Sequence, residues 1–322
     1  MKMSLPLDFE TLHFCGEVRP GYGEDNWCYG FANSSGMIAV FDGCGGSGSR
    51  QHKAYQDHTE AFMAARLCAG SLYESMHSSF IGEFTAEALT TQVLENAFNT
   101  CIACNAPPVG SSSFKMKGLR TLPSTMASML VQCADNGELL VSPIWAGDSR
   151  AYILDSTGLS QMTDDDSTQK DPMEGQYDDG ILTNIICGDN PVNLHYCTYK
   201  VKPPFMVLVA TDGCFGYVST PMEFEGMILH TMLESSSVAQ WEENLRNLIG
   251  SFAHDDHTLC LASFGYGSFE NIQKTFETRY HELRQAFLEP VWALPWEDRD
   301  SRRKLWAKYR PNYMKFIEGD DR

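Results

Sequence analysis

The amino-acid sequence predicts an α+β fold. The expected form is a four-layer αββα sandwich of two antiparallel sheets flanked by helix pairs, with a helical C-terminal extension. Segments of strand character and of helical periodicity occur in blocks, in the order strands, two helices, strands, two helices, strand. Single strands do not alternate with single helices, as parallel βαβ units require, so antiparallel sheets with helix pairs outside them are expected.

The first 45 residues have the character of short strands. Their apolar and aromatic runs are separated by turn formers such as Pro20-Gly21 and Asn33-Ser34-Ser35-Gly36. These runs predict strands at 12–18, 27–32 and 37–41.

Helical periodicity follows this block. Apolar residues recur about every 3.6 positions from Tyr55 to Leu72. A second helix is expected over residues 86–105, because Pro107 and Pro108 come directly after it.

Two further blocks complete the pattern. The expected strands are 126–134, 138–146, 150–154, 195–201, 205–210 and 258–264, and the expected helices are 221–234 and 238–252. Two connections stand out, a basic loop at 110–122 and a long acidic segment at 165–194. A connection as long as the second is usually functional or mobile.

The chain is expected to divide after residue 268. Residues 1–268 contain all of these blocks, whereas 269–322 are charged and rich in Trp and Tyr. This extension predicts two or more helices, interrupted near Pro290 and Pro295. Its aromatic content favours packing on the domain 1–268, and partner binding is the alternative.

Composition restricts the class of function. The chain has 322 residues and a net charge of −18, from 24 Lys and Arg against 42 Asp and Glu. Nucleic-acid binding through a broad basic surface is therefore not expected. No run approaches the roughly 20 apolar residues of a membrane-spanning helix, so no membrane association is expected. The 11 Cys, an odd number in a long chain without a signal sequence, favour reduced thiols and a cytoplasmic location.

Carboxylates recur at the ends of the expected strands. One apolar strand runs into Asp42-Gly43 and another into Asp212-Gly213, while Glu24-Asp25 and Asp255 precede strands. A single Asp-Gly is usually only a hairpin turn. Several carboxylates at strand ends can converge, and hard divalent ions such as Mg²⁺ or Mn²⁺ relieve their repulsion through oxygen ligands. The positions together predict a metal centre.

The motifs around these carboxylates are similar to those of one family. The segments GEDNW, FDGCGGSGS, PSTMASMLV, IWAGDSRAYIL, MTDDDS, ILTNIICGD, VLVATDG and DDHTLCLAS occur in this order between residues 10 and 265. Together they resemble the PP2C-type (PPM) metal-dependent serine/threonine protein phosphatases, in a divergent, bacterial-like form. The family fold is the sandwich expected above. The resemblance implies hydrolysis of phosphoserine and phosphothreonine in proteins by a metal-bridged hydroxide that attacks phosphorus in line.

The resemblance also implies a binuclear centre of Mn²⁺ or Mg²⁺. Asp42 would bridge both ions. Glu24 and the Gly43 carbonyl would hold one ion, and Asp212 and Asp255 would hold the other.

Two further roles follow from the resemblance. Asp25 would act through waters, and Arg19 would bind the substrate phosphate through its guanidinium fork. Arg19 stands five residues before Glu24, whereas the family Arg usually stands four before, so one extra loop residue has to be accommodated.

Cys44 and Gly216 depart from the family pattern. Many members have a His at the position of Cys44 that is thought to protonate the leaving group, so this acid is left open. Gly216 replaces an Asp of a third, weaker metal site, although Asp148, the other residue of that site, is present. Two ions are expected, and a third at Asp148 is left open.

The expected partner is a phosphoprotein, linked to a serine/threonine kinase and selected by the loops 110–122 and 165–194. The departures at Arg19, Cys44 and Gly216 also support an alternative. In this alternative the chain is a weak or inactive pseudophosphatase that serves as a binding or scaffold module.

Overall fold

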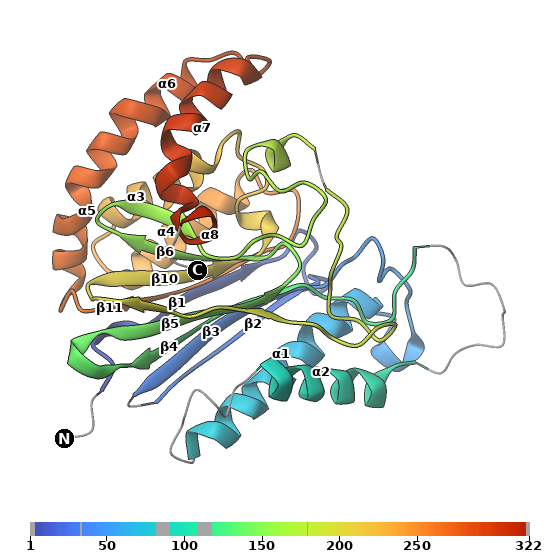
Figure 1. Ribbon diagram of the computed structural model, residues 1–322. Coiled ribbons are helices and arrows are strands. Elements are labelled where there is room, and N and C mark those ends of the chain that lie inside the picture. The colour runs from blue at the N-terminus through green and yellow to red at the C-terminus, as the bar shows by residue number, and fades with distance from the viewer. Residues whose placement is uncertain (1–3, 33, 82–90, 108–117, 179, 320–322) are drawn as a thin grey trace.

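Two antiparallel β-sheets lie face to face at the centre of the computed structural model, with helices on both outer faces (Figure 1). The structure describes residues 4–32, 34–81, 91–107, 118–178 and 180–319. The first sheet has the order β1 (Leu7–Gly16), β11 (His257–Phe264), β10 (Phe205–Ala210), β6 (Arg150–Asp155) and β7 (Gly158–Gln161). The second has the order β2 (Asp25–Phe31), β3 (Ser35–Asp42), β4 (Met126–Cys133), β5 (Leu139–Ala146) and β8 (His195–Tyr196), and β9 (Tyr199–Val201) also pairs with β5. The predicted fold class is confirmed.

Strand β3 is buried on both faces, which explains its uninterrupted apolar sequence. Met37, Ala39 and Phe41 belong to the core beneath the helices of the second sheet. Ile38 and Val40 belong to the core between the two sheets. Since successive side chains of a strand point to opposite faces, a strand between two cores has no polar face.

A helix pair covers the outer face of each sheet. The helices α1 (Glu60–Ile81) and α2 (Thr91–Asn105) cover the second sheet, and α3 (Pro221–Leu233) and α4 (Val238–Gly250) cover the first (Figure 1). The predicted start of the second helix, at residue 86, lies outside the described residues, as does most of the predicted loop 110–122. No helix in the described ranges combines the length and apolar character needed to span a membrane.

The C-terminal residues form helices that stand beside α3 and α4, on the side away from α1 and α2 (Figure 1). They are α5 (Phe269–Leu283), a wide turn at Arg284–Leu288, α6 (Glu289–Trp292), α7 (Arg299–Tyr313) and α8 (Lys315–Glu318). The helix is not interrupted at Pro290, because this residue lies in the first turn of α6, where no backbone donor is needed. The interruption occurs after Trp292, in the segment that contains Pro295.

The extension shares one hydrophobic core with the helix pair of the first sheet. Phe276, Leu288 and Trp306 are buried in the same cluster as Ile228 and Trp241. The extension therefore packs on the sandwich along this face. The division of domains at residue 268 stays a prediction.

The strand predictions differ from the structure in detail. Strand β1 is Leu7–Gly16 rather than 12–18. The predicted strand 195–201 is split into β8 and β9, which pair with different parts of β5. Strand β7 was not predicted. It follows a tight turn that ends at Gly158, where φ is +115°, a value that favours glycine.

Candidate metal centre

The pairing of β2 with β3 brings two predicted ligands together. Asp25, at the start of β2, lies opposite Asp42, at the end of β3. The backbone N–H of Thr125 donates to the Asp42 carbonyl at 2.8 Å, which ties this strand end to β4. The hydroxyl of Thr211 donates to the Asp25 carboxylate at 2.8 Å. Asp25 therefore links the end of the second sheet to the first.

Glu24 is held in place by hydrogen bonds to two neighbours. Its backbone N–H donates to the Asp256 carboxylate at 2.7 Å, and the Thr59 hydroxyl donates to its own carboxylate. A Cβ at Gly45 would lie 2.2 Å from that carboxylate, so any larger residue there would displace the Glu24 side chain. In the sequence, the glycines that follow Asp42 indicate that another part of the chain comes close to this turn.

Gly43 lies where the backbones of three elements meet. Its N–H donates to the Glu24 carbonyl at 3.1 Å. A Cβ at this position would lie 2.2 Å from the Ala61 carbonyl of α1 and 2.8 Å from the Glu24 carbonyl. The close approach of α1 explains why glycine follows Asp42.

The remaining predicted ligands come from the ends of other strands. Asp212 begins the short helical turn after β10, Asp255 lies in the turn before β11, and Asp148 lies in the hairpin between β5 and β6. The neighbouring Asp256 accepts hydrogen bonds from Val18 at 2.8 Å and from Glu24. Asp256 is thus used to anchor the loop 17–24, which leaves Asp255 as the predicted ligand.

These carboxylates affect one another's ionisation. Burial, followed by the charges of Asp212 and Asp25, raises the pKa of Asp42 well above its usual range. Burial also raises the pKa of Asp25, and Asp212 adds to this effect. The pKa of Asp148 is raised to about 8 by burial and then by Asp212 and Asp165, against the opposing charge of Arg150. These mutual effects place the four strand ends in one electrostatic cluster.

A divalent cation fits this donor set. Carboxylates that raise one another's pKa ionise at a cost that a cation would offset, and their oxygens suit Mg²⁺ or Mn²⁺. Within the described ranges, no group of three or more His, Cys, Asp and Glu side chains is arranged as a ready metal-binding cluster. The side chains would therefore have to turn towards an ion when they bind it.

Two adjoining hollows open onto the cluster. One of about 560 Å³ is lined by Glu24, Asp42 and Gly43. The other, of about 340 Å³, is lined by Asp148 and Asp212. Asp255, Gly180 and Leu182 line both hollows.

The predicted phosphate ligand Arg19 lies on the surface. Its guanidinium is 3.7 Å from the centre of the Tyr22 ring, and Arg19 does not line either hollow. Arg120 lines the hollow that contains Glu24 and Asp42. The backbone of Arg120 is fixed, since its N–H donates to the Ser47 carbonyl at 2.9 Å and its own carbonyl accepts from Arg50 at 3.0 Å. The sequence signal for Arg120 was the basic character of the loop 110–122.

Two of the positions that depart from the family pattern, Cys44 and Gly216, line these hollows. Cys44 lines the hollow of Asp42, and burial together with the Asp42 charge raises the pKa of its thiol well above the usual value. Gly216 lines the hollow of Asp148. The two histidines beside Asp255 are used elsewhere, because His254 contacts the Tyr217 ring and His257 is buried in β11.

A buried ion pair supports the hairpin of Asp148. Arg150 donates to Asp165 through Nε, at 3.0 and 3.1 Å, and through Nη2, at 2.7 Å. Its guanidinium also lies 4.3 Å from the centre of the Phe215 ring. Asp165 starts the acidic segment 165–194, so this pair fixes one end of that segment beside the cluster. The motif that contains Asp148 was recognised in the sequence, but the ion pair between Arg150 and Asp165 was not predicted.

A larger cavity, of about 760 Å³, lies between α3, α4 and the C-terminal helices. Its walls are mainly apolar and aromatic, including Met227, Phe252, Trp292 and Trp296, and none of the predicted ligands lines it. This cavity is larger than the two hollows at the acidic cluster, so cavity volume does not indicate where the candidate metal centre lies.

The sandwich with carboxylates gathered at its strand ends defines a chain with the fold of the PP2C-type phosphatases. Among solved structures, the serine/threonine phosphatase Stp1 from Staphylococcus aureus matches with a TM-score of 0.55 and 18% identity, over 82% of this chain and 98% of that one. The catalytic domain of PstP in complex with two manganese ions matches with a TM-score of 0.51 and 17% identity, over 79% and 97%. PppA, a regulatory component of the type VI secretion system (T6SS) in Pseudomonas aeruginosa, matches with a TM-score of 0.53 and 19% identity, over 80% and 97%. No protein-family model and no curated protein sequence matches the chain.

Proposed function

We propose that this chain hydrolyses phosphoserine and phosphothreonine in proteins at a centre of two Mn²⁺ or Mg²⁺ ions. One observation supports this most strongly. Asp25, Asp42, Asp148 and Asp212 come from the ends of different strands and form one cluster, in which Asp25 is buried and the other three are partly buried. Burial and the charge of Asp212 raise the pKa of Asp25, Asp42 and Asp148. Such a concentration of negative charge is costly without cations, and phosphate needs cations in order to enter it.

Each carboxylate has a role in the proposed site. Asp42 would contact both ions, with Glu24 and the Gly43 carbonyl on one side and Asp212 and Asp255 on the other. When bound, the ions would lower the pKa of a coordinated water and neutralise charge on the phosphate. Asp25, which accepts the Thr211 hydroxyl, would orient waters around the ions. Asp148 would hold a third ion if one binds.

The substrate phosphate would be held by an arginine. Arg120 lines the hollow with Asp42, and a guanidinium fork matches two phosphate oxygens. Arg19 is the candidate from the family resemblance, and its loop would have to bring it from the Tyr22 ring to the hollow. Cys44 keeps its proton at neutral pH, since burial raises the pKa of its thiol, so it would not act as a thiolate nucleophile.

Activity on phosphopeptides and on p-nitrophenyl phosphate tests this proposal. We expect turnover with Mn²⁺, none with EDTA, and a loss of about a hundredfold or more in Asp42→Asn, because the variant loses the ligand shared by both ions. Asp135→Asn, in an exposed turn, is the matched control and should keep wild-type activity. A folded wild-type chain that turns over neither substrate with Mn²⁺, Mg²⁺ or other divalent ions would contradict the proposal.

The second candidate is a scaffold that keeps the fold without catalysis. The exposed Arg19, together with Cys44 and Gly216, favours it. A scaffold need not bind Mn²⁺, whereas the enzyme must. Retention of the whole carboxylate set supports the enzyme.

A further inference from the structure

A short turn of the acidic segment forms one wall of the candidate site. The turn covers residues 171–177 and contains the single helical turn Glu174–Gln176. Asp171, Gly175 and Gln176 line the same hollow as Asp148 and Asp212. The position of this turn therefore sets how far the hollow is open above the carboxylates.

Helix α7 of the C-terminal extension holds the outer side of this turn. Arg303 donates to both carboxylate oxygens of Glu174, at 2.6 and 2.8 Å. The indole N–H of Trp306 donates to Asp171 at 3.3 Å, and the Arg310 guanidinium lies 3.6 Å from the same carboxylate. Exposed ion pairs usually contribute little, but a two-pronged Arg–carboxylate pair also fixes orientation.

Tyr177, at the end of the turn, is held from two sides. Its ring lies 5.9 Å from the ring of Trp296 and 4.4 Å from the guanidinium of Arg299, both in the extension. Its hydroxyl donates to the Ser219 carbonyl at 3.0 Å, in the segment that follows Asp212. The turn thus lies between the extension and the strand end that carries a predicted ligand.

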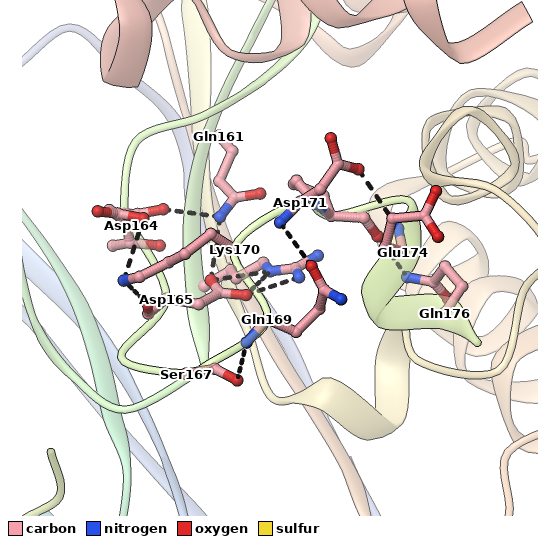
Figure 2. A network of polar contacts seen from close by, with 12 residues as sticks. Gln161, Asp164, Asp165, Ser167, Gln169, Lys170, Asp171, Glu174 and Gln176 are labelled. Atoms are coloured by element: carbon pink, nitrogen blue, oxygen red, sulfur yellow. Dashed lines mark hydrogen bonds and ion pairs between the residues drawn. The ribbon is translucent and has the colours of Figure 1, made fainter. Parts of the chain in front are cut away.

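The hydrogen bonds within the segment do not fix its place on the sandwich. The Asp171 carboxylate accepts from the N–H groups of Met173, at 2.8 Å, and Glu174, at 3.3 Å, so it caps its own turn. Gln169 bonds to the N–H of Asp171 at 3.3 Å (Figure 2). These bonds shape the turn locally. The contacts from α7, the bond from Tyr177 to Ser219 and the buried side chain of Met173 connect it to the rest of the molecule.

Helix α7 is itself firmly attached to the first sheet. The Ser160 hydroxyl of β7 donates to the Asn312 carbonyl at 2.9 Å, and the Asn312 side chain donates to the Thr157 carbonyl at 3.0 Å. Trp306 and Tyr313 are buried in the core. A helix anchored in this way can support the turn 171–177.

From these contacts we infer that the C-terminal extension positions the wall of the substrate site, with Arg303 and Trp306 as positioning residues for the turn 171–177. The inference rests on the proposed phosphatase function for its effect on substrate. A phosphoprotein has to contact the walls of the hollow, whereas a small ester needs only the carboxylate cluster. Loss of the contact from α7 should therefore weaken binding of the larger substrate selectively.

Charge reversal tests the inference. Arg303→Glu and Glu174→Arg should each raise KM for a phosphopeptide about fivefold or more, with kcat on p-nitrophenyl phosphate changed less than about twofold. Each should also speed amide hydrogen exchange in residues 168–178. The double variant restores opposite charges and should return both measurements towards wild type. Lys274→Glu, which breaks the exposed pair of Lys274 with Glu270 on α5, is the matched control and should change neither.

Two results would overturn the inference. One is unchanged amide hydrogen exchange together with unchanged KM for the phosphopeptide in folded Arg303→Glu. The other is failure of the double variant to recover either measurement. Trp306→Phe provides an independent variant, since it removes the N–H that bonds to Asp171 and keeps an aromatic ring in the core. If the wild-type chain has no phosphatase activity, the proposed function fails, and the exchange measurements still test whether α7 holds the turn.

Discussion

Asp42 and Asp25 face each other at the end of two paired strands, and burial, with the charge of Asp212 adding to it, raises the pKa of both carboxyl groups. In the absence of cations such groups favour their neutral forms, because burial and like charges both penalise ionisation. A bound cation reverses this preference. Metal binding and the pH dependence of stability are therefore linked at the level of single residues.

Asp148 gives a direct test of this link. Its pKa is about 8 in the folded chain and about 3.9 in an unfolded one. Between these values the folded state keeps a proton that the unfolded state releases, so stability falls as pH rises from about 4 to about 8. With EDTA at pH 8, we expect Asp148→Asn to raise the melting temperature by about 2 °C or more, which corresponds to about 1 kcal/mol. The gain should shrink towards pH 5, and an equal gain at both values would contradict the account.

Phosphate binding distinguishes Arg120 from Arg19. We expect Arg120→Ala to weaken inhibition by inorganic phosphate about tenfold, because it removes a charge-assisted hydrogen bond worth about 1.5 kcal/mol. Arg19→Ala should change it less than about twofold, since Arg19 lies over the Tyr22 ring outside the hollow. The inhibition constant for phosphate measures both effects. If Arg19→Ala weakens inhibition by phosphate more than Arg120→Ala does, Arg19, the candidate from the family resemblance, is favoured instead.

At the residue scale, the sequence predicted which carboxylates stand at strand ends better than it predicted the contacts that support them. Asp42, Asp148 and Asp212 stand at recognisable strand ends. The role of Asp256 in holding the N–H of Glu24 depends on residues 232 positions apart, and no local pattern encodes it. Only the folded chain shows that Arg120 is the arginine that lines the hollow.

At the scale of elements, burial explains which segments were predictable. Strand β10 lies between two cores, with Leu208 in one and Val207 in the other, and its apolar run has few alternative interpretations. Its bounds agree with the prediction. Short edge elements carry weaker signals: β8 and β9 were predicted as one strand, and β7 was missed. Pro290 misled the prediction because the first turn of a helix tolerates proline.

A buried pair ties α5 to α3 and provides a prediction at this scale. Arg279 of α5 donates to Glu225 of α3 at 2.7 and 2.9 Å, and the Tyr309 hydroxyl of α7 donates to the same carboxylate. Arg279→Met would leave the fully buried Glu225 with the hydroxyl of Tyr309 alone, so we expect a loss of about 3–5 kcal/mol in the free energy of unfolding. Urea denaturation measures it.

Lys274→Met on the same helix is the control for this variant. Lys274 pairs with Glu270 on the surface, and the loss there should be about 0.5 kcal/mol or less. If the two variants lose similar stability, the pair of Arg279 and Glu225 does not hold the extension in place.

At the scale of the whole molecule, the extension and the sandwich share one core. Deletion of residues 269–322 removes Phe276, Leu288, Trp306 and Tyr313 from the cluster that contains Ile228. We expect the truncated chain to bind more of a hydrophobic dye, to melt at a lower temperature and to be less soluble, because apolar surface is exposed. A chain that lacks only residues 320–322 is the control. Equal solubility and stability after the large deletion would instead assign the extension to partner binding.

The sandwich as a whole was predictable because block order and motif order agree along the chain. The attachment of the extension to the segment 165–194 was not, since it depends on pairs such as Arg303 with Glu174 that lie 129 residues apart. The candidate substrate hollow and the contacts from the extension therefore meet at the turn 171–177.

The central claim is that the carboxylates at the strand ends form a binuclear cation site. Calorimetric titration of Mn²⁺ into the metal-free chain tests it most directly. We expect two ions to bind per chain, Asp42→Asn to lose this binding, and Asp135→Asn to retain it. A folded wild-type chain without saturable Mn²⁺ binding, or an Asp42→Asn variant that binds as wild type does, would contradict the claim.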